Sequence, residues 1–178
     1  MPRNIEIKAR LDHIDAVRAR AAALADQGPI EIRQDDTFFR CAHGRLKLRA
    51  FSACEGELIF YRRADAQGPK ESYYLRSPTA SPDTLREALA QAHGLAGRVR
   101  KHRTLFLVGR TRIHLDVVHD LGHFLELEVV LEEHEPAERG VQEAHDLMAR
   151  LGVEPSRLID KAYVDLLSPS TPHRPEAA

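Results

Sequence analysis

The feature that most constrains the fold is the placement of charged residues in segments that alternate polar and apolar side chains. Glu6 and Lys8 alternate with two isoleucines and an alanine, and Lys47 and Arg49 alternate with two leucines and an alanine. Successive side chains of a β-strand point to opposite faces, so each segment sends its charges to one face and its apolar residues to the other. We therefore expect a sheet with one strongly charged face.

The same alternation recurs later in the chain, and three of the pairs carry one sign each: Lys47 with Arg49, Lys101 with Arg103, and Glu126 with Glu128. The charged or ionisable residues of the later segments that share a parity are Lys101 with Arg103, Arg112 with His114 and Asp116, and Glu126 with Glu128. Leu105 and Leu107 continue the parity of Lys101 and weaken the pattern there. A solvated outer face is the ordinary explanation of such alternation. Pairs of like charge instead favour a concave face that binds ligands.

The periodicity predicts an α+β fold with a largely antiparallel sheet, curled or closed on itself. Strands are expected at 4–11, 30–40, 45–51, 57–63, 72–76, 98–108, 111–118 and 123–131. Helices are expected from a cap at Asp12 to a stop at Gly28-Pro29, from Ser81 to Gly94, over 136–151, and as a short fourth helix over 156–167. Consecutive strands flanked by helices disfavour an alternating parallel fold.

Composition narrows the classes of protein that the chain can represent. The 178 residues fit one domain, expected over 1–167, with a flexible proline-rich tail over 168–178. Lys and Arg number 26 against 27 Asp and Glu, which disfavours a nucleic-acid partner. Only Cys41 and Cys54 occur, and there is neither a leader nor an apolar run of the roughly 18 residues that a membrane span needs. We expect a cytoplasmic protein with no membrane partner.

A concave charged face would bring six cations to one space: Lys8, Lys47, Arg49, Lys101, Arg103 and Arg112. Burying them without counter-charge would be very costly, so a polyanion is expected. A triphosphate suits the set, because Arg offers paired donors and Lys a compact charge. Glu6, Glu126 and Glu128, with Asp116 nearby, would repel a bare polyphosphate, so a hard divalent cation, Mg²⁺ or Mn²⁺, is also expected.

The sequence resembles the CYTH superfamily, the triphosphate tunnel metalloenzymes, over nearly all of residues 3 to 167. The segments that carry the resemblance are Asn4-Ile-Glu-Ile-Lys8, Gln34-Asp-Asp-Thr-Phe-Phe39, Gly44-Arg-Leu-Lys-Leu-Arg49, Ile59-Phe-Tyr-Arg62, Lys70-Glu-Ser72, Val99-Arg-Lys-His-Arg103, Arg112-Ile-His-Leu-Asp116, Leu121-Gly-His-Phe-Leu-Glu-Leu-Glu128 and Lys161-Ala-Tyr-Val-Asp-Leu-Leu167. The branch that the chain looks most like is that of the class IV adenylate cyclases, which is related to the thiamine triphosphatases.

The resemblance implies a closed or nearly closed eight-stranded antiparallel β-barrel that forms a tunnel for a triphosphate. By match to the family pattern, the phosphate-binding residues would be Lys8, Lys47, Arg49, Lys101 and Arg103, with Arg62 (or its neighbour Arg63), Arg112 and Lys161 as further candidates. Glu6, Glu126 and Glu128 would hold Mg²⁺ or Mn²⁺. Lys8 and Asp116 would be catalytic, and Lys161 would close the tunnel. Relatives of this branch often form homodimers, so the resemblance makes a homodimer an option.

Three functions remain open at the level of the sequence. The first, which we prefer, is cyclisation of ATP to cyclic AMP and pyrophosphate. The second is a triphosphatase that hydrolyses thiamine triphosphate, inorganic triphosphate or a nucleotide. The third is a non-catalytic module that binds nucleotide or polyphosphate, suggested by Asn4, which stands where the family has Glu and supplies one charge fewer for metal.

A zinc site is the weaker alternative for the histidines. His114, His119 and His123 lie close to Asp116 in the sequence, but their spacing matches no pattern typical of a metal-binding helix. The sequence also contains no Walker-type phosphate loop, so any triphosphate recognition must rest on the charged face of the sheet.

Overall fold

The protein is a closed eight-stranded antiparallel barrel with helices on its outside. The computed structural model describes residues 3–63 and 68–167, with the side chain of Arg63 left out, so the tail predicted over 168–178 lies outside the described residues. The strands are β1 (Arg3–Leu11), β2 (Gln27–Phe39), β3 (Arg45–Ala50), β4 (Gly56–Arg63), β5 (Lys70–Thr79), β6 (Leu95–Val108), β7 (Thr111–Val118) and β8 (Gly122–Leu131).

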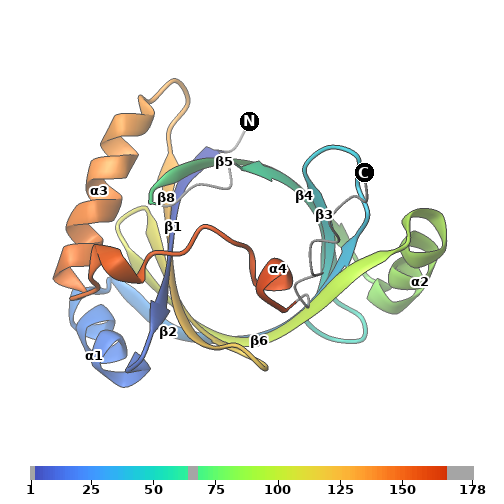
Figure 1. Ribbon diagram of the computed structural model, residues 1–178, viewed down its shortest axis with the longest axis horizontal. Helices are drawn as coiled ribbons and strands as arrows, with labels where there is room; N and C mark the ends of the chain where they lie inside the picture. The colour runs from blue at the N-terminus through green and yellow to red at the C-terminus, as the bar shows by residue number, and fades with distance from the viewer. Residues whose placement is uncertain (1–2, 64–67, 168–178) are drawn as a thin grey trace, which may run out of the picture.

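The strands follow the order β1-β5-β4-β3-β2-β6-β7-β8 around the ring, and every neighbouring pair is antiparallel (Figure 1). β1 closes the barrel because it pairs with β5 on one side and with β8 on the other. Closure gives every one of these strands a hydrogen-bonded neighbour on both sides. The predicted α+β class, the antiparallel pairing and the barrel are confirmed.

The main apolar core lies outside the barrel, between the sheet and two helices. α1 (Ile14–Leu24) and α3 (Ala137–Arg150) cover the outer faces of β1, β6, β7 and β8 (Figure 1). The buried outer side chains include Ile7, Leu115 and Leu127, which pack in one cluster with Val17 and Leu147. Small barrels usually fill their interior with such residues. Here the apolar residues face outward, which leaves the interior to charged side chains.

α3 approaches the sheet closely at a glycine. A Cβ atom at Gly140 would lie 2.7 Å from side-chain carbons of both Ile5 and Leu131. The absence of a side chain therefore allows the helix to lie against β1 and β8, and it holds these two strands where they contribute Glu6, Glu126 and Glu128.

The carboxyl-terminal segment closes one end of the barrel. After α3 the chain passes through the short 3₁₀ turn η1 (Pro155–Arg157) and then reaches α4 (Tyr163–Leu167), which lies across the opening (Figure 1). The amide of Ile159 donates to the carbonyl oxygen of Lys8 at 2.9 Å. Ala162, Tyr163 and Val164 belong to a second apolar cluster with residues of β2, β6, β7 and β8. One mouth of the barrel is thus filled by the chain itself.

Several predicted element boundaries were wrong. α1 begins at Ile14 after His13, because the Asp12 carboxylate instead pairs with Arg157. The helix ends at Leu24, and Gly28-Pro29 lies within β2, at a shift in the pairing with β6. The segment 156–167 is not one helix, because Leu158 forms a β-bridge with Ala9.

The other two helices agree with their sequence signals. α2 (Pro82–His93) begins directly after Ser81 and ends before Gly94, although the Ser81 side chain makes no capping hydrogen bond. α3 lies within the predicted range 136–151. None of the helices in the described part of the chain has both the length and the apolar character that crossing a membrane requires.

Candidate functional site

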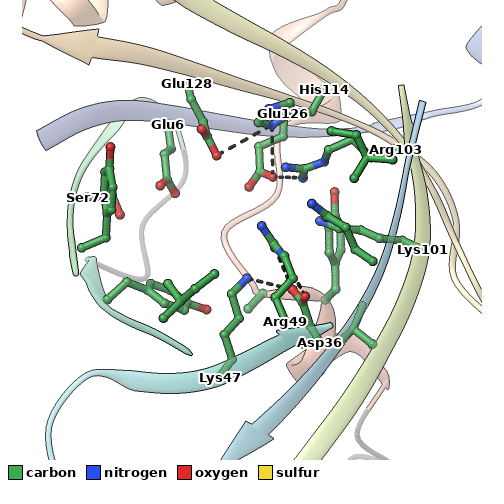
Figure 2. Close-up of a pocket in the computed structure, with 18 of the residues that line it drawn as sticks. Glu6, Asp36, Lys47, Arg49, Ser72, Lys101, Arg103, His114, Glu126 and Glu128 are labelled. Atoms are coloured by element: carbon green, nitrogen blue, oxygen red, sulfur yellow. Dashed lines mark hydrogen bonds and ion pairs between the residues drawn. The ribbon is translucent and has the colours of Figure 1, made fainter. Parts of the chain in front are cut away.

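The barrel interior contains a cavity of about 310 Å³ to which all eight strands contribute side chains. The cations that line it are Lys8, Lys47, Arg49, Arg76, Lys101, Arg103 and Arg112. The carboxylates that line it are Glu6, Asp36, Glu57, Glu126 and Glu128. Figure 2 shows many of these side chains pointing from different strands into the same space.

Arg103 is oriented by the fully buried carboxylate of Asp116, which does not itself line the cavity. Nε and Nη2 of Arg103 donate to the two oxygens of Asp116, both at 2.7 Å, and Nη2 also donates to Glu126 at 2.7 Å. Burial alone would raise the pKa of Asp116, but Arg103 and Lys101 outweigh this effect and hold it well below its usual range. Asp116 is therefore a permanent anion that orients its neighbours. The Nη1 group of Arg103 takes no part in these bonds.

Tyr163 contacts the same group of residues from α4. Its hydroxyl donates to Asp116 at 3.1 Å. The ammonium groups of Lys8 and Lys101 lie over its ring, 4.1 and 5.1 Å from the ring centroid. Burial, and then the Asp116 carboxylate, raise the pKa of Tyr163 well above its usual range, so the hydroxyl stays a donor. The helix that closes the barrel thus also fixes the floor of the cavity.

Asp36 makes an equivalent arrangement on β2. It accepts hydrogen bonds from Nζ of Lys47 and from Nε and Nη2 of Arg49, each at 2.8 Å. Burial opposes ionisation of Asp36, but Arg49 and Lys47 outweigh it and depress its pKa far below normal. Asp36 and Asp116 therefore each orient one arginine and one lysine around the cavity.

Lys101 is the cation most affected by its surroundings. Its ammonium lies 3.1 Å from Asp116, and the side chain is almost completely buried. Burial, followed by repulsion from Arg103, lowers the pKa of Lys101 to about 7, although Asp116 acts in the opposite direction. An added anion in the cavity would therefore favour the charged form of this lysine.

Three of the five carboxylates that line the cavity lie on the adjacent strands β1 and β8. Glu6 is the register partner of Glu128, and Lys8 is the partner of Glu126, whose carboxylate is 3.3 Å from the lysine ammonium. Like charges directly opposite one another destabilise a sheet unless a cation lies nearby. Carboxylate oxygens are the ligands that Mg²⁺ and Mn²⁺ prefer, so Glu6, Glu126 and Glu128 fit a hard divalent cation.

Three buried polar atoms on the cavity wall lack a hydrogen-bond partner within the described residues. They are Oδ1 of Asn4, Oε1 of Gln34 and Nδ1 of His114. Most buried polar atoms in native proteins are paired. Three unpaired atoms around one cavity indicate a polar occupant that supplies the missing partners.

The structure brings together most of the residues predicted for the site. Those that line the cavity are Lys8, Lys47, Arg49, Lys101, Arg103, Arg112, Glu6, Glu126 and Glu128. Asp116 lies behind the wall and contacts the cavity only through other side chains. Ser72 also lines the cavity, beside Asn4 on the neighbouring strand.

Two predicted phosphate-binding residues lie elsewhere. Arg62 is exposed and stacks over Tyr73, because the register of β4 turns Tyr61 rather than Arg62 toward the cavity. Lys161 is exposed in the segment before α4 and does not line the cavity. The alternative grouping of histidines is not formed, because His119 is exposed and paired with Asp120, while His114 faces the cavity.

Several residues of the cavity were missed by sequence reasoning: Asp36, Glu57, Arg76, His114 as a site residue, and Tyr163. Asp36 could have been found, since it shares its strand parity with Gln34 and Phe38, which also line the cavity. Tyr163 had no comparable signal, because its place depends on how the carboxyl-terminal segment folds back over the barrel.

Comparison with protein-family models gives a match to the CYTH domain over residues 2–163. The chain belongs to the CYTH domain family. Comparison with curated proteins finds no match.

Solved structures share the CYTH fold of this chain at low sequence identity. The PH1012 protein of Pyrococcus horikoshii OT3 is 22% identical with a TM-score of 0.81, over 93% of this chain and 99% of its own. An adenylate cyclase candidate from Vibrio parahaemolyticus is 16% identical with a TM-score of 0.72, over 93% of this chain and 98% of its own.

A third similar structure comes from Hippeastrum. It is a candidate adenylyl cyclase with a dominant triphosphatase activity, 18% identical with a TM-score of 0.63, over 89% of this chain and 91% of its own. At these identities the likeness establishes the fold of this CYTH protein, and its reaction must be argued from the cavity.

Proposed function

We propose that this CYTH protein is an enzyme that holds a triphosphate inside its barrel together with Mg²⁺ or Mn²⁺ and breaks a phosphorus–oxygen bond. The observation that carries the proposal is the cavity itself: seven cationic side chains line one space inside the barrel, and three buried polar atoms on its wall have no hydrogen-bond partner within the described residues. A small polyanion matches that space in charge and in hydrogen-bonding capacity.

Arg49 and Arg103 are the central phosphate-binding groups. Each is fixed through Nε and Nη2 by a buried aspartate, so little side-chain entropy is lost when it binds phosphate. Nη1 is not used in either aspartate pair, although in Arg49 it lies 3.9 Å from Glu57. Lys47, Lys101 and Arg112 add charge around them. This preorganised set favours the additional negative charge that develops in a transition state at phosphorus.

Glu6, Glu126 and Glu128 are the proposed metal ligands. A divalent cation bound there would neutralise phosphate charge and act as a Lewis acid on a phosphoryl oxygen. Lys8 lies between this group and the floor of the cavity, 3.3 Å from Glu126. We assign Lys8 to direct contact with the phosphate under attack.

We assign Asp116 to positioning rather than to contact with substrate. It is completely buried and reaches the cavity only through Arg103, Lys101 and Tyr163. The sequence-based expectation that Asp116 acts together with Lys8 is therefore refined: Lys8 contacts phosphate, and Asp116 holds the groups that do.

The first reaction we propose is cyclisation of ATP, in which the ribose 3′-oxygen attacks the α-phosphorus and pyrophosphate leaves. The triphosphate would occupy the charged cavity, with the nucleoside toward the end of the barrel away from α4.

The second reaction is hydrolysis of a terminal phosphate, with water as the nucleophile. It is favoured by the size of the cavity, about 310 Å³, which is at the lower limit for pockets that enclose drug-sized ligands. An inorganic triphosphate would need no site for an organic group.

A cytoplasmic location and a homodimer stay predictions from the sequence.

Product analysis separates these reactions. The purified protein is incubated with ATP, inorganic triphosphate or thiamine triphosphate and with Mg²⁺ or Mn²⁺, and products are followed by phosphorus NMR and chromatography. Cyclic AMP with pyrophosphate supports cyclisation, whereas orthophosphate supports hydrolysis. Tight binding without turnover would contradict an enzymatic role and leave a binding module. The Arg49→Ala variant serves as the inactive control.

A further inference from the structure

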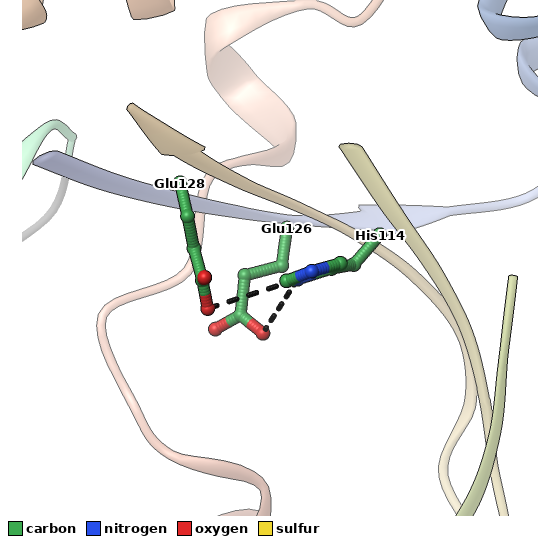
Figure 3. A group of neighbouring side chains, drawn as sticks. All are labelled: His114, Glu126 and Glu128. Atoms are coloured by element: carbon green, nitrogen blue, oxygen red, sulfur yellow. Dashed lines mark ion pairs between the residues drawn. The ribbon is translucent and has the colours of Figure 1, made fainter. Parts of the chain in front are cut away.

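His114 lies beside two carboxylates on the wall of the cavity. Ligand atoms of His114, Glu126 and Glu128 all lie within 4.8 Å of one another (Figure 3). Nδ1 of His114 is 3.7 Å from Oε1 of Glu128 and 3.9 Å from Oε2 of Glu126. Both separations exceed hydrogen-bonding distance, and Nδ1 has no other partner within the described residues.

The His114 ring is almost completely buried, with 4% of the residue exposed. In a neutral imidazole one of the two ring nitrogens carries a lone pair. An unpaired lone pair at Nδ1 would face two carboxylates, which are themselves acceptors. Only a proton or a cation between them makes these three groups compatible.

The two separations from His114 suit a cation shared with the carboxylates. Nitrogen and oxygen ligands bind first-row metals at about 2.0–2.2 Å, so two such bonds can join atoms that are up to roughly 4.2 Å apart. The separations of 3.7 and 3.9 Å fall within this limit. In this arrangement the other ring nitrogen of His114, Nε2, would carry the proton.

We propose that His114 completes the metal site through Nδ1, with Glu126 and Glu128, and that the site therefore binds a transition cation such as Co²⁺ or Zn²⁺ more tightly than Mg²⁺. This inference deepens the proposed function, because it concerns the cation of the same site. Imidazole favours later first-row metals, whereas a site made of carboxylates alone suits Mg²⁺.

Neighbouring cations set the strength of the site. Glu126 also contacts Lys8 and Arg103, and Glu128 lies 3.3 Å from Arg112. These groups oppose binding of a divalent ion, so absolute affinity will be modest without a polyanion. The preference among metals is less affected, because the same cations repel every divalent ion.

The test is a calorimetric titration of the metal-free protein with CoCl₂ and, separately, with MgCl₂, in the absence of any triphosphate. The variant His114→Phe keeps a planar ring and removes both nitrogens. The matched control is His145→Phe, at an exposed position on α3. Wild type and control should bind Co²⁺ at least about tenfold more tightly than Mg²⁺, and His114→Phe should lose most of that preference.

Two results would overturn the proposal: unchanged Co²⁺ affinity in His114→Phe, or equal losses for Co²⁺ and Mg²⁺. If the variant does not fold, nitrogen NMR of the wild-type histidine rings during titration with ZnCl₂ tests whether His114 binds the metal. The proposal expects a large shift of Nδ1 in one buried ring, and its absence at saturating Zn²⁺ contradicts it.

The outcome is separable from that of the proposed function. Triphosphate turnover with no metal contact at His114 would reject this inference and leave the function standing. A His114-dependent metal site in a protein that neither binds nor converts triphosphates would do the reverse.

Discussion

Arg103 on β6 and Asp116 on β7 form a two-pronged ion pair, with both nitrogen-to-oxygen distances at 2.7 Å. The aspartate side chain has no exposed surface, and the arginine has 5%. Because neither charge is open to solvent, the pair fixes the direction of the arginine within the cavity.

Asp116→Asn should destabilise the fold by about 3–5 kcal/mol, because it leaves buried cations without their counter-charge. The measurement is the free energy of unfolding in urea. Asp35→Asn is the matched control: Asp35 also pairs with an arginine through two bonds, but that arginine, Arg98, is 55% exposed. The control should cost at most about 1 kcal/mol. Equal losses in the two variants would refute a special role for Asp116.

Arg49 and Arg62 provide a test of which face of the barrel binds phosphate. Arg49→Ala should weaken binding of inorganic triphosphate roughly 10- to 100-fold, as expected from losing charge-assisted hydrogen bonds. Arg62→Ala should change it by less than about twofold, because the exposed Arg62 side chain lies outside the cavity. Calorimetry with Mn²⁺ present measures both. A larger loss of triphosphate affinity in Arg62→Ala than in Arg49→Ala would mean that phosphate binds outside the cavity, contrary to our proposal.

Lys101 makes triphosphate binding dependent on pH. Its pKa of about 7 in the free protein lies below that of an ordinary lysine, so it loses its proton as the pH rises through 7. A bound polyanion favours the ammonium form and raises this pKa, so binding at pH 8 takes up a proton. Affinity should therefore fall between pH 7.5 and pH 9, by up to about tenfold per pH unit for one proton.

The control for this prediction is Lys101→Arg, which stays charged over the whole range. Its affinity should depend less steeply on pH than that of the wild type. Proton uptake is measured by calorimetry in two buffers that differ in ionisation enthalpy. Identical pH profiles for wild type and Lys101→Arg would exclude Lys101 as the titrating group.

Asn4 occupies a buried position on β1, where only 2% of the residue is exposed and Oδ1 is unpaired. Asn4→Glu should lower the melting temperature of the metal-free protein, since it buries a further negative charge on the strand that carries Glu6. Saturating Mn²⁺ should restore much of the loss by binding the added carboxylate. Asn4→Gln is the neutral control of the same size. If Mn²⁺ shifts both variants equally, Asn4 does not face the metal.

The charged face could be predicted from the sequence because strand parity is a local property. Lys47 and Arg49, like Glu126 and Glu128, alternate with apolar residues, so one period of two assigns all of them to the same side. The antiparallel class followed from runs of consecutive strands. These signals need no knowledge of which strands pair.

Arg62 shows where local reasoning ends. The segment 57–63 has apolar residues at both parities, so its sequence does not tell Tyr61 from Arg62. The choice is made by register, since Tyr61 pairs with Arg45 on one side and with Tyr74 on the other. Long-range pairing also places His114 opposite Glu126, a contact that the sequence alone does not reveal.

The carboxyl-terminal segment depends even more on tertiary structure. Lys70 donates to the carbonyl oxygen of Asp160 at 3.1 Å, and Arg45 pairs with Asp165 through two bonds of 2.9 and 2.7 Å. These contacts join residues that are 90 and 120 positions apart. They hold Tyr163 on the wall of the cavity, while Lys161 in the same segment is exposed and does not line it.

The most direct test of the account is a crystal structure of the protein with inorganic triphosphate and Mn²⁺, using anomalous scattering to locate the metal. The account predicts phosphate density inside the barrel between Arg49 and Arg103, with a manganese peak beside Glu126 and Glu128. Triphosphate bound only on the outer surface, or a barrel that holds only water at saturating triphosphate, would contradict it.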